Sequence, residues 1–223
     1  MMNFIIGNNP QQSLTKTTPA TTSSLLHKYS SFINAKRNDS NLSYFLKKWL
    51  THGEVNVYIW HHWVQVVVPT NLIPNGDLAY VYINGGSNPD LNNPPTDVDT
   101  VVTQVATSTG LIGVNLRDIP NQPVVFSADI NGRARSEDAL IAFTWSHFIN
   151  NTLEYDWLAR MPMTKASVLT MNVVQEFVAQ HLPTLTPVTR FAFAGGSKRG
   201  WTTWMVGLYP LLLSFSSFKI HNY

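Results

Sequence analysis

The chain has 223 residues, of which 44% are hydrophobic, so it is long and apolar enough to bury the core of one sizeable domain. Its formal net charge is only +2 and its lysines and arginines are scattered, which excludes a strongly basic nucleic-acid surface. The absence of cysteine excludes disulfides, thiolate metal sites and thiol catalysis. No apolar run reaches the roughly 18 residues of a membrane-spanning helix, and we expect no transmembrane segment.

The first 41 residues differ from the rest of the chain because they are rich in Asn, Ser and Thr. Their early apolar cluster, Phe4-Ile5-Ile6, is too short for the hydrophobic region of a secretory signal. We interpret residues 1–41 as a largely disordered polar leader, with a short amphipathic helix over Leu25–Ile33 as the alternative. The folded domain is expected over residues 42–206, followed by a divergent apolar tail over residues 207–223.

Two β-rich runs open the predicted domain, and a pair of histidines separates them. The runs are Val55–Trp60 and Trp63–Val68. Neighbouring residues of a strand point to opposite faces, so His61 and His62 are not expected to bind one ion together. The sequence therefore predicts no metal site.

The next predicted strand, Leu78–Asn84, runs directly into the loop residues Gly85, Gly86 and Ser87. A glycine pair after a buried strand leaves backbone N–H groups free. Such a loop supplies one half of the oxyanion hole in α/β-hydrolases. The alternative is an ordinary turn.

Strands and helices alternate through the middle of the chain. The β-branched segment Asp97–Thr107 has helical periodicity, and Leu111–Arg117 reads as a further strand. One helix is expected from Ser136, with acidic residues in its first turn, and a longer one over Met163–Leu182, capped at Thr164. This alternation predicts an α/β fold with a mostly parallel sheet flanked by helices.

The stretch from Arg190 onward carries the candidate chemistry. Residues 190–194 form an apolar strand, two glycines allow a sharp turn, and a helix follows with Ser197 at the bend. This is the context of a nucleophile elbow, in which the helix start, here the backbone of Lys198, faces a developing oxyanion. Arg199 stands where the pattern G-x-S-x-G has a small residue. The alternative is therefore a glycine turn whose Ser197 caps the helix through its hydroxyl.

Several blocks of sequence, in this order, carry a resemblance to a known family. They read WVQVVVP (63–69), INGGSN (83–88), IPNQP (119–123), RSEDALIA (135–142), RMPMTKA (160–166) and GSKRGWTTW (196–204). In these blocks the chain resembles the PhoPQ-activated pathogenicity-related protein family, which includes autocrine proliferation repressors. The resemblance implies an α/β-hydrolase fold, usually an exported protein, with Ser197 at the elbow position. It implies no cofactor and no established substrate.

Members of that family usually continue well past the elbow helix, so the resemblance implies that the C-terminal part of the fold is missing from this chain. In α/β-hydrolases the acid and the histidine follow the nucleophile along the chain. After Ser197 the sequence has no Asp or Glu, and its one histidine is His221. A serine without a base is a weak nucleophile, so whether this chain is an enzyme stays open.

Three hypotheses remain for the function. The first is a regulatory protein on a hydrolase scaffold that acts by binding a protein partner. The second is a serine ester or peptide hydrolase with a small substrate, whose acid and histidine lie in a missing C-terminal part. The third is a gene-model fragment without a function of its own.

Localisation and self-association also follow as expectations. Members usually begin with a signal peptide, whereas the N-terminus as written has no hydrophobic signal core, which predicts a chain that stays inside the cell. Asn-x-Ser/Thr triplets begin at Asn38, Asn41 and Asn150 and would accept glycans only after export. The elbow strand, left with an open edge, predicts self-association.

Overall fold

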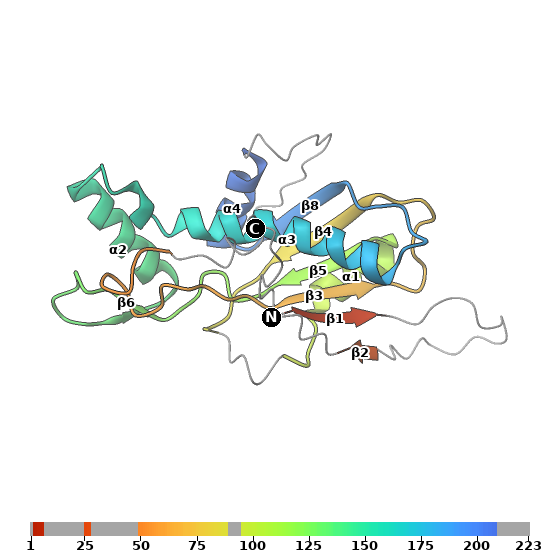
Figure 1. Cartoon of the computed structure of the whole chain (residues 1–223), viewed down its shortest axis with the longest axis horizontal. Helices are drawn as coiled ribbons and strands as arrows, with labels where there is room; N and C mark the ends of the chain where they lie inside the picture. The colour runs from red at the N-terminus through yellow and green to blue at the C-terminus, as the bar shows by residue number, and fades with distance from the viewer. Residues whose placement is uncertain (1, 7–24, 28–48, 89–94, 209–223) are drawn as a thin grey trace.

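The computed structural model describes residues 2–6, 25–27, 49–88 and 95–208. Within these residues six strands form one sheet in the order β2-β1-β3-β5-β4-β8 (Figure 1). The strands are β1 (Met2–Ile6), β2 (Leu25–His27), β3 (Val64–Val68), β4 (Leu78–Ile83), β5 (Ile112–Leu116) and β8 (Arg190–Gly195). A small second sheet pairs β6 (Val124–Val125) with β7 (Ala134–Arg135).

The larger sheet is mixed. Strand β4 runs parallel to both of its neighbours, β5 and β8, and β1 runs parallel to β3. Strand β3 is reversed relative to β5, and β1 and β2 form an antiparallel pair. Strands β3 and β5 are buried along their whole length, as expected for strands covered on both faces.

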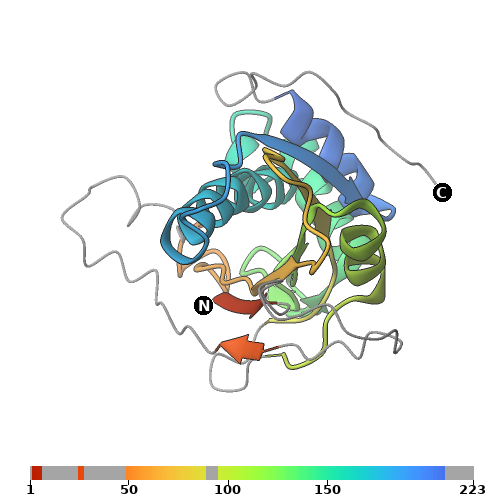
Figure 2. The same cartoon turned by 90° about the vertical axis from the view of Figure 1, so that its right-hand side faces the viewer.

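Helices cover both faces of this sheet. The helices of the described residues are α1 (Thr100–Thr109), α2 (Glu137–Asn150), α3 (Arg160–His181) and α4 (Lys198–Gly207), with a 3₁₀ turn η1 at Tyr155–Trp157. Figure 2 shows α1 and α3 on opposite sides of the strands. Helix α4 packs against β8 and α3. No helix in the described part of the chain is long and apolar enough to cross a membrane.

Two hydrophobic clusters result from this arrangement. On the α3 side the main core contains the buried stripe of that helix, Met163, Val168, Met171, Val174 and Phe177. On the α1 side a smaller cluster joins Val102 and Ala106 to Val67 of β3. Helix α1 lies close to β5, since a Cβ at Gly113 would come within 3.0 Å of Val102 Cγ1.

Most predicted elements are present with shifted ends. Helix α1 begins after Asp99, whose carboxylate accepts a hydrogen bond from the Val101 N–H at 2.8 Å. Helix α3 begins at Arg160, before its predicted start, so Thr164 is no cap and instead donates its hydroxyl to the Arg160 carbonyl. The predicted strand at residues 55–60 is wrong, because only Val55 forms an isolated bridge there.

The interpretation of the N-terminus needs a partial correction. Two short stretches of the predicted disordered leader, β1 and β2, are strands that extend the sheet beside β3. The rest of the leader, the predicted start of the domain near residue 42 and the tail beyond Leu208 lie outside the described residues.

Candidate functional site

Ser197 joins β8 to α4 and has a strained backbone. Its φ is 52° and its ψ is −119°, a conformation that non-glycine residues rarely adopt. The side chain is exposed, and it makes no capping hydrogen bond to α4. The alternative of a simple helix-capping serine is therefore wrong. The turn holds the hydroxyl out at the carboxyl end of the parallel strands.

Glycines permit the close packing around this turn. A Cβ on Gly200 would lie 2.8 Å from the Gly195 carbonyl oxygen, and a Cβ on Gly195 would lie 2.8 Å from the Cβ of Arg199. Strand β8 and the first turn of α4 therefore touch through their backbones. The small residue that this contact requires is Gly200, one position later than in the G-x-S-x-G pattern.

This packing explains the bulky residue at position 199. The Cβ of Arg199 lies at the Gly195 contact, and the end of its side chain reaches the loop after β5, where Nε donates to the Ile119 carbonyl at 2.7 Å. Its Nη2 donates to Glu137, and a Cβ on Gly85 would come within 2.8 Å of that nitrogen. Arg199 therefore lies between the elbow and the loop that follows β4.

Glu137 is the centre of a network that joins four segments at this edge of the sheet. Its carboxylate accepts hydrogen bonds from Arg199 and from Gln122 Nε2, the latter at 2.6 Å. The Lys198 ammonium lies 2.6 Å from the second carboxylate oxygen. Gln122 Nε2 also donates to the Gly86 carbonyl at 2.7 Å. The start of α2, the start of α4 and the loops after β4 and β5 are thus tied to one carboxylate.

The electrostatics of this network favour the ionised carboxylate. Burial opposes ionisation of Glu137, but the hydrogen bonds from Arg199, Lys198 and Gln122 outweigh it and lower its pKa to about 2. The Lys198 side chain is only 9% exposed, and its ammonium is also 3.1 Å from Asp138. Both cations of the elbow helix are therefore engaged in ion pairs.

The loop after β4 does not leave all of its predicted N–H groups free. Gly85 donates its N–H to the Asn84 side chain at 2.8 Å, and its carbonyl accepts from the Asp118 N–H. Gly86 has a φ of 147°, and a Cβ there would come within 2.0 Å of Asp118 Oδ1. Gly86 and Ser87 are exposed. Because β4 pairs with β8 in parallel, this loop and Ser197 lie at adjacent strand ends.

Asp118, at the end of β5, is a buried acid that sequence reasoning did not single out. It has a positive φ of 64°, and its Oδ2 has no hydrogen-bond partner among the described residues. Burial raises its pKa to about 6, although the Arg117 charge and a backbone hydrogen bond from Trp63 act in the opposite direction. The turn signal after β5 was visible in the sequence, but the burial of its acid was not.

Arg160 was also missed as part of this region. It is almost completely buried, and its Nη1 donates to the Lys198 carbonyl at 2.5 Å. Its guanidinium lies 4.1 Å from the centre of the half-exposed Trp201 ring. Through this hydrogen bond and this cation–π contact, the start of α3 packs against the first turn of α4.

Other candidate groups lie apart from this network. No cluster of three or more His, Asp or Glu suited to a metal occurs in the described part of the chain. The His62 ring lies beside the Arg117 carbonyl, and burial lowers its pKa to about 3. The described residues provide no hydrogen-bonded base for Ser197.

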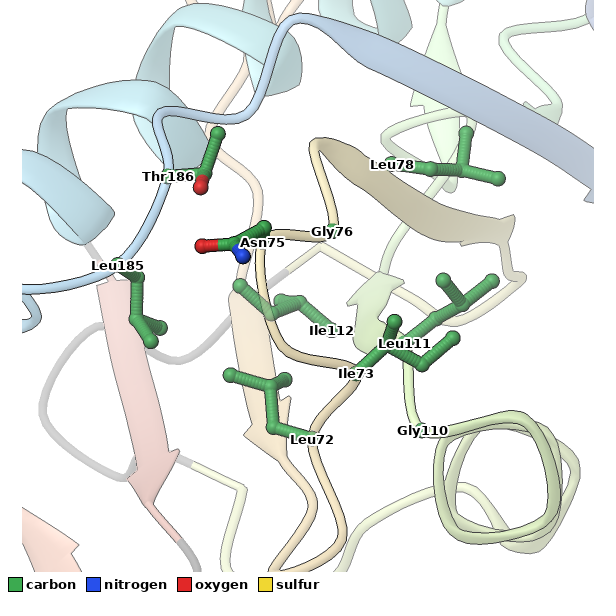
Figure 3. A pocket seen from close by; sticks show the side chains of 10 residues that line it. All are labelled: Leu72, Ile73, Asn75, Gly76, Leu78, Gly110, Leu111, Ile112, Leu185 and Thr186. Carbon is green, nitrogen blue, oxygen red and sulfur yellow. The ribbon is translucent and has the colours of Figure 1, made fainter.

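A small pocket lies at the other end of the strands (Figure 3). It is lined by the loop before β4, by the start of β5 and by the segment before β8, including Leu72, Ile73, Leu111, Leu185 and Thr186. These residues precede the strands, whereas Ser197 follows one. The pocket is therefore no part of the elbow site.

Comparison with known proteins agrees with the sequence blocks. The profile described as "PhoPQ-activated pathogenicity-related protein" matches residues 23–210. The chain is 42% identical over 153 residues to "Autocrine proliferation repressor protein A" of Dictyostelium discoideum. That match covers 67% of this chain but 29% of the relative, so the chain spans less than a third of the relative's length. No solved structure matches. Because the family profile covers most of its residues, the chain belongs to the PhoPQ-activated pathogenicity-related protein family.

Proposed function

We propose that this chain belongs to a regulatory protein that restrains proliferation outside the cell, and that it does so by binding a protein partner on an α/β-hydrolase scaffold. The similarity to a protein named as an autocrine proliferation repressor supports the regulatory role. The chain corresponds to only part of that relative, and the proposal assigns the restraint of proliferation to this part.

The scaffold is supported by the elbow and its neighbours. In α/β-hydrolases the nucleophile sits on a strained turn between a strand and a helix, beside the strand that ends in the oxyanion loop. Here the strained Ser197 follows β8, and β8 pairs with β4, which ends in the Gly85–Gly86 loop.

One observation favours binding over turnover. The Ser197 hydroxyl has no hydrogen-bonded base among the described residues, while the side chains of Lys198 and Arg199 are engaged by Glu137. An unassisted hydroxyl is a poor nucleophile, whereas a network of ion pairs gives a rigid surface.

The test is a growth assay on Dictyostelium discoideum cells with the purified full chain added to the medium. We expect slower proliferation with the unaltered chain and with Ser197→Ala alike, since binding does not need the hydroxyl. Unchanged proliferation at saturating concentrations would contradict the proposed role.

A serine ester or peptide hydrolase is the second candidate, and the strained, exposed Ser197 favours it. Strain of this kind concentrates at functional sites and costs about 1–3 kcal/mol. A fluorophosphonate probe discriminates the two functions. Labelling that disappears in Ser197→Ala would establish an activated serine, and a loss of growth restraint in the same variant would assign that restraint to catalysis.

A further inference from the structure

The end of α2 carries an exposed glycosylation triplet. Asn150 is the last residue of the helix, and Asn151 and Thr152 begin the turn that follows; all three are exposed. The triplet has the acceptor amide, a middle residue other than proline, and a hydroxyl two positions later. The triplets at Asn38 and Asn41 lie outside the described residues.

The turn that presents this triplet is fixed by the residues around it. The Asn151 N–H donates to the carbonyls of His147 and Phe148, closing the end of the helix. The His147 ring stacks on Trp157 with centroids 3.5 Å apart, and its Nε2 pairs with Glu154. The triplet therefore stays on the surface while the turn is folded.

We propose that Asn150 is an N-glycosylation site, an inference that rests on the extracellular role proposed above. A bond forms between Asn150 Nδ2 and C1 of the sugar as the bond from C1 to the phosphate oxygen of a polyprenyl-diphosphate oligosaccharide breaks. Nδ2 loses one proton, and the polyprenyl diphosphate leaves. Nδ2 keeps its second proton, so its 3.0 Å hydrogen bond to the Ser146 carbonyl can persist.

The apolar surroundings of Asn150 fit an attached sugar. Ile149, Leu153 and Tyr155 are 70%, 87% and 60% exposed, which is unusual for three large apolar side chains so close in sequence. The face of a sugar ring that carries C–H groups is apolar, and it can pack on such side chains and on tyrosine rings. A glycan at Asn150 would cover this surface.

The position also leaves the elbow network accessible. Glu137 is at the first turn of α2 and Asn150 at its last, about 20 Å apart along a helix of 14 residues. Figure 1 shows α2 at the far side of the molecule from strands β1 and β2. A glycan there would not block binding at Ser197.

The experiment is translation of the full chain behind a cleavable secretory leader in the presence of microsomes, with Asn38 and Asn41 both changed to Gln. The unaltered Asn150 triplet is compared with Asn150→Gln and Thr152→Ala. Asn151→Gln is the matched control, because it changes the adjacent exposed amide and keeps the acceptor triplet. Glycan occupancy is read as a mobility shift that peptide N-glycosidase F removes.

We expect the shift in the starting chain and in Asn151→Gln, and its complete loss in Asn150→Gln and Thr152→Ala. A shift that survives in both triplet variants, or is absent from the starting chain, overturns the proposal. As a second arm, mass spectrometry of the exported protein from its own cells should find Asn150 occupied, and an unmodified Asn150 there also overturns it. Neither readout depends on growth restraint, so failure of the regulatory role is scored separately.

Discussion

Replacing Glu137 by Gln should destabilise the chain by removing the charge to which the elbow helix is tied. Its pKa falls from 4.5 to about 2 on folding. At about 1.4 kcal/mol for each tenfold change in proton affinity, this corresponds to an upper bound of about 3.4 kcal/mol. The Glu137 side chain is 39% exposed, so solvent screens part of the interaction. We expect Glu137→Gln to lower the free energy of unfolding by about 1–2 kcal/mol at pH 7.

The direction of the pKa shift determines how the stability difference depends on pH. The folded-state pKa of Glu137 is depressed, so its stabilising contribution is complete above the unfolded pKa of 4.5 and disappears as the pH falls toward about 2. The difference between the unaltered chain and Glu137→Gln should therefore be largest above about pH 5 and shrink steadily below it.

Urea unfolding followed by tryptophan fluorescence, repeated from pH 7 down to pH 3, measures this difference. Asp138→Asn is the matched control: it lies on the same helix turn and also faces Lys198, but its side chain is 85% exposed. We expect that control to change stability by no more than a few tenths of a kcal/mol. Equal effects of the two substitutions, or a Glu137→Gln effect that does not change with pH, would refute the reasoning.

Three further predictions concern the same end of the sheet and its edge. Asp118→Asn should stabilise the chain above pH 6 and remove the loss of stability between about pH 4 and 6, because the raised pKa makes the ionised acid unfavourable in the fold; urea titrations that show no gain at pH 7 would contradict this. Gly200→Ala should lower the melting temperature, since its Cβ would lie 2.8 Å from a carbonyl oxygen, whereas Gly196→Ala, with no atom within 4 Å, should not; calorimetry giving equal shifts would be inconsistent with the packing. The full chain should self-associate through β8, which ends the sheet among the described residues, and Ala192→Lys should reduce this; light scattering that finds the unaltered chain monomeric would exclude it.

Much of the fold was predictable because its signals are local. The apolar runs of β3, β4, β5 and β8 and the stripe of α3 depend on periodicity, and they occur close to the predicted positions. The start of α3 was predicted too late, at Met163 instead of Arg160. A proline is tolerated in the first turn of a helix, so Pro162 lies inside α3 and does not mark its boundary. The reversal of β3 was not predictable, since periodicity carries no strand direction.

The candidate site was predictable only in part. The turns at Ser197 and at Gly85–Gly86 were predictable because glycines directly after an apolar strand are visible in the sequence. Glu137 was seen only as an acidic residue in a helix start, because its partners are 15 and 62 positions away. The ion pair of Arg190 with Asp77, just before β4, was also not predictable, because the two residues are far apart in the sequence.

The contact between Arg199 and Gly85 has a consequence for how relatives of this chain can diverge. A side chain at position 85 would meet the guanidinium 2.8 Å away, so any relative that loses this glycine must move or shorten the side chain at position 199. A shorter residue 199 would in turn leave Glu137 with one cation fewer. These three positions should therefore change together across the family, and a laboratory library that randomises them separately should recover few folded members.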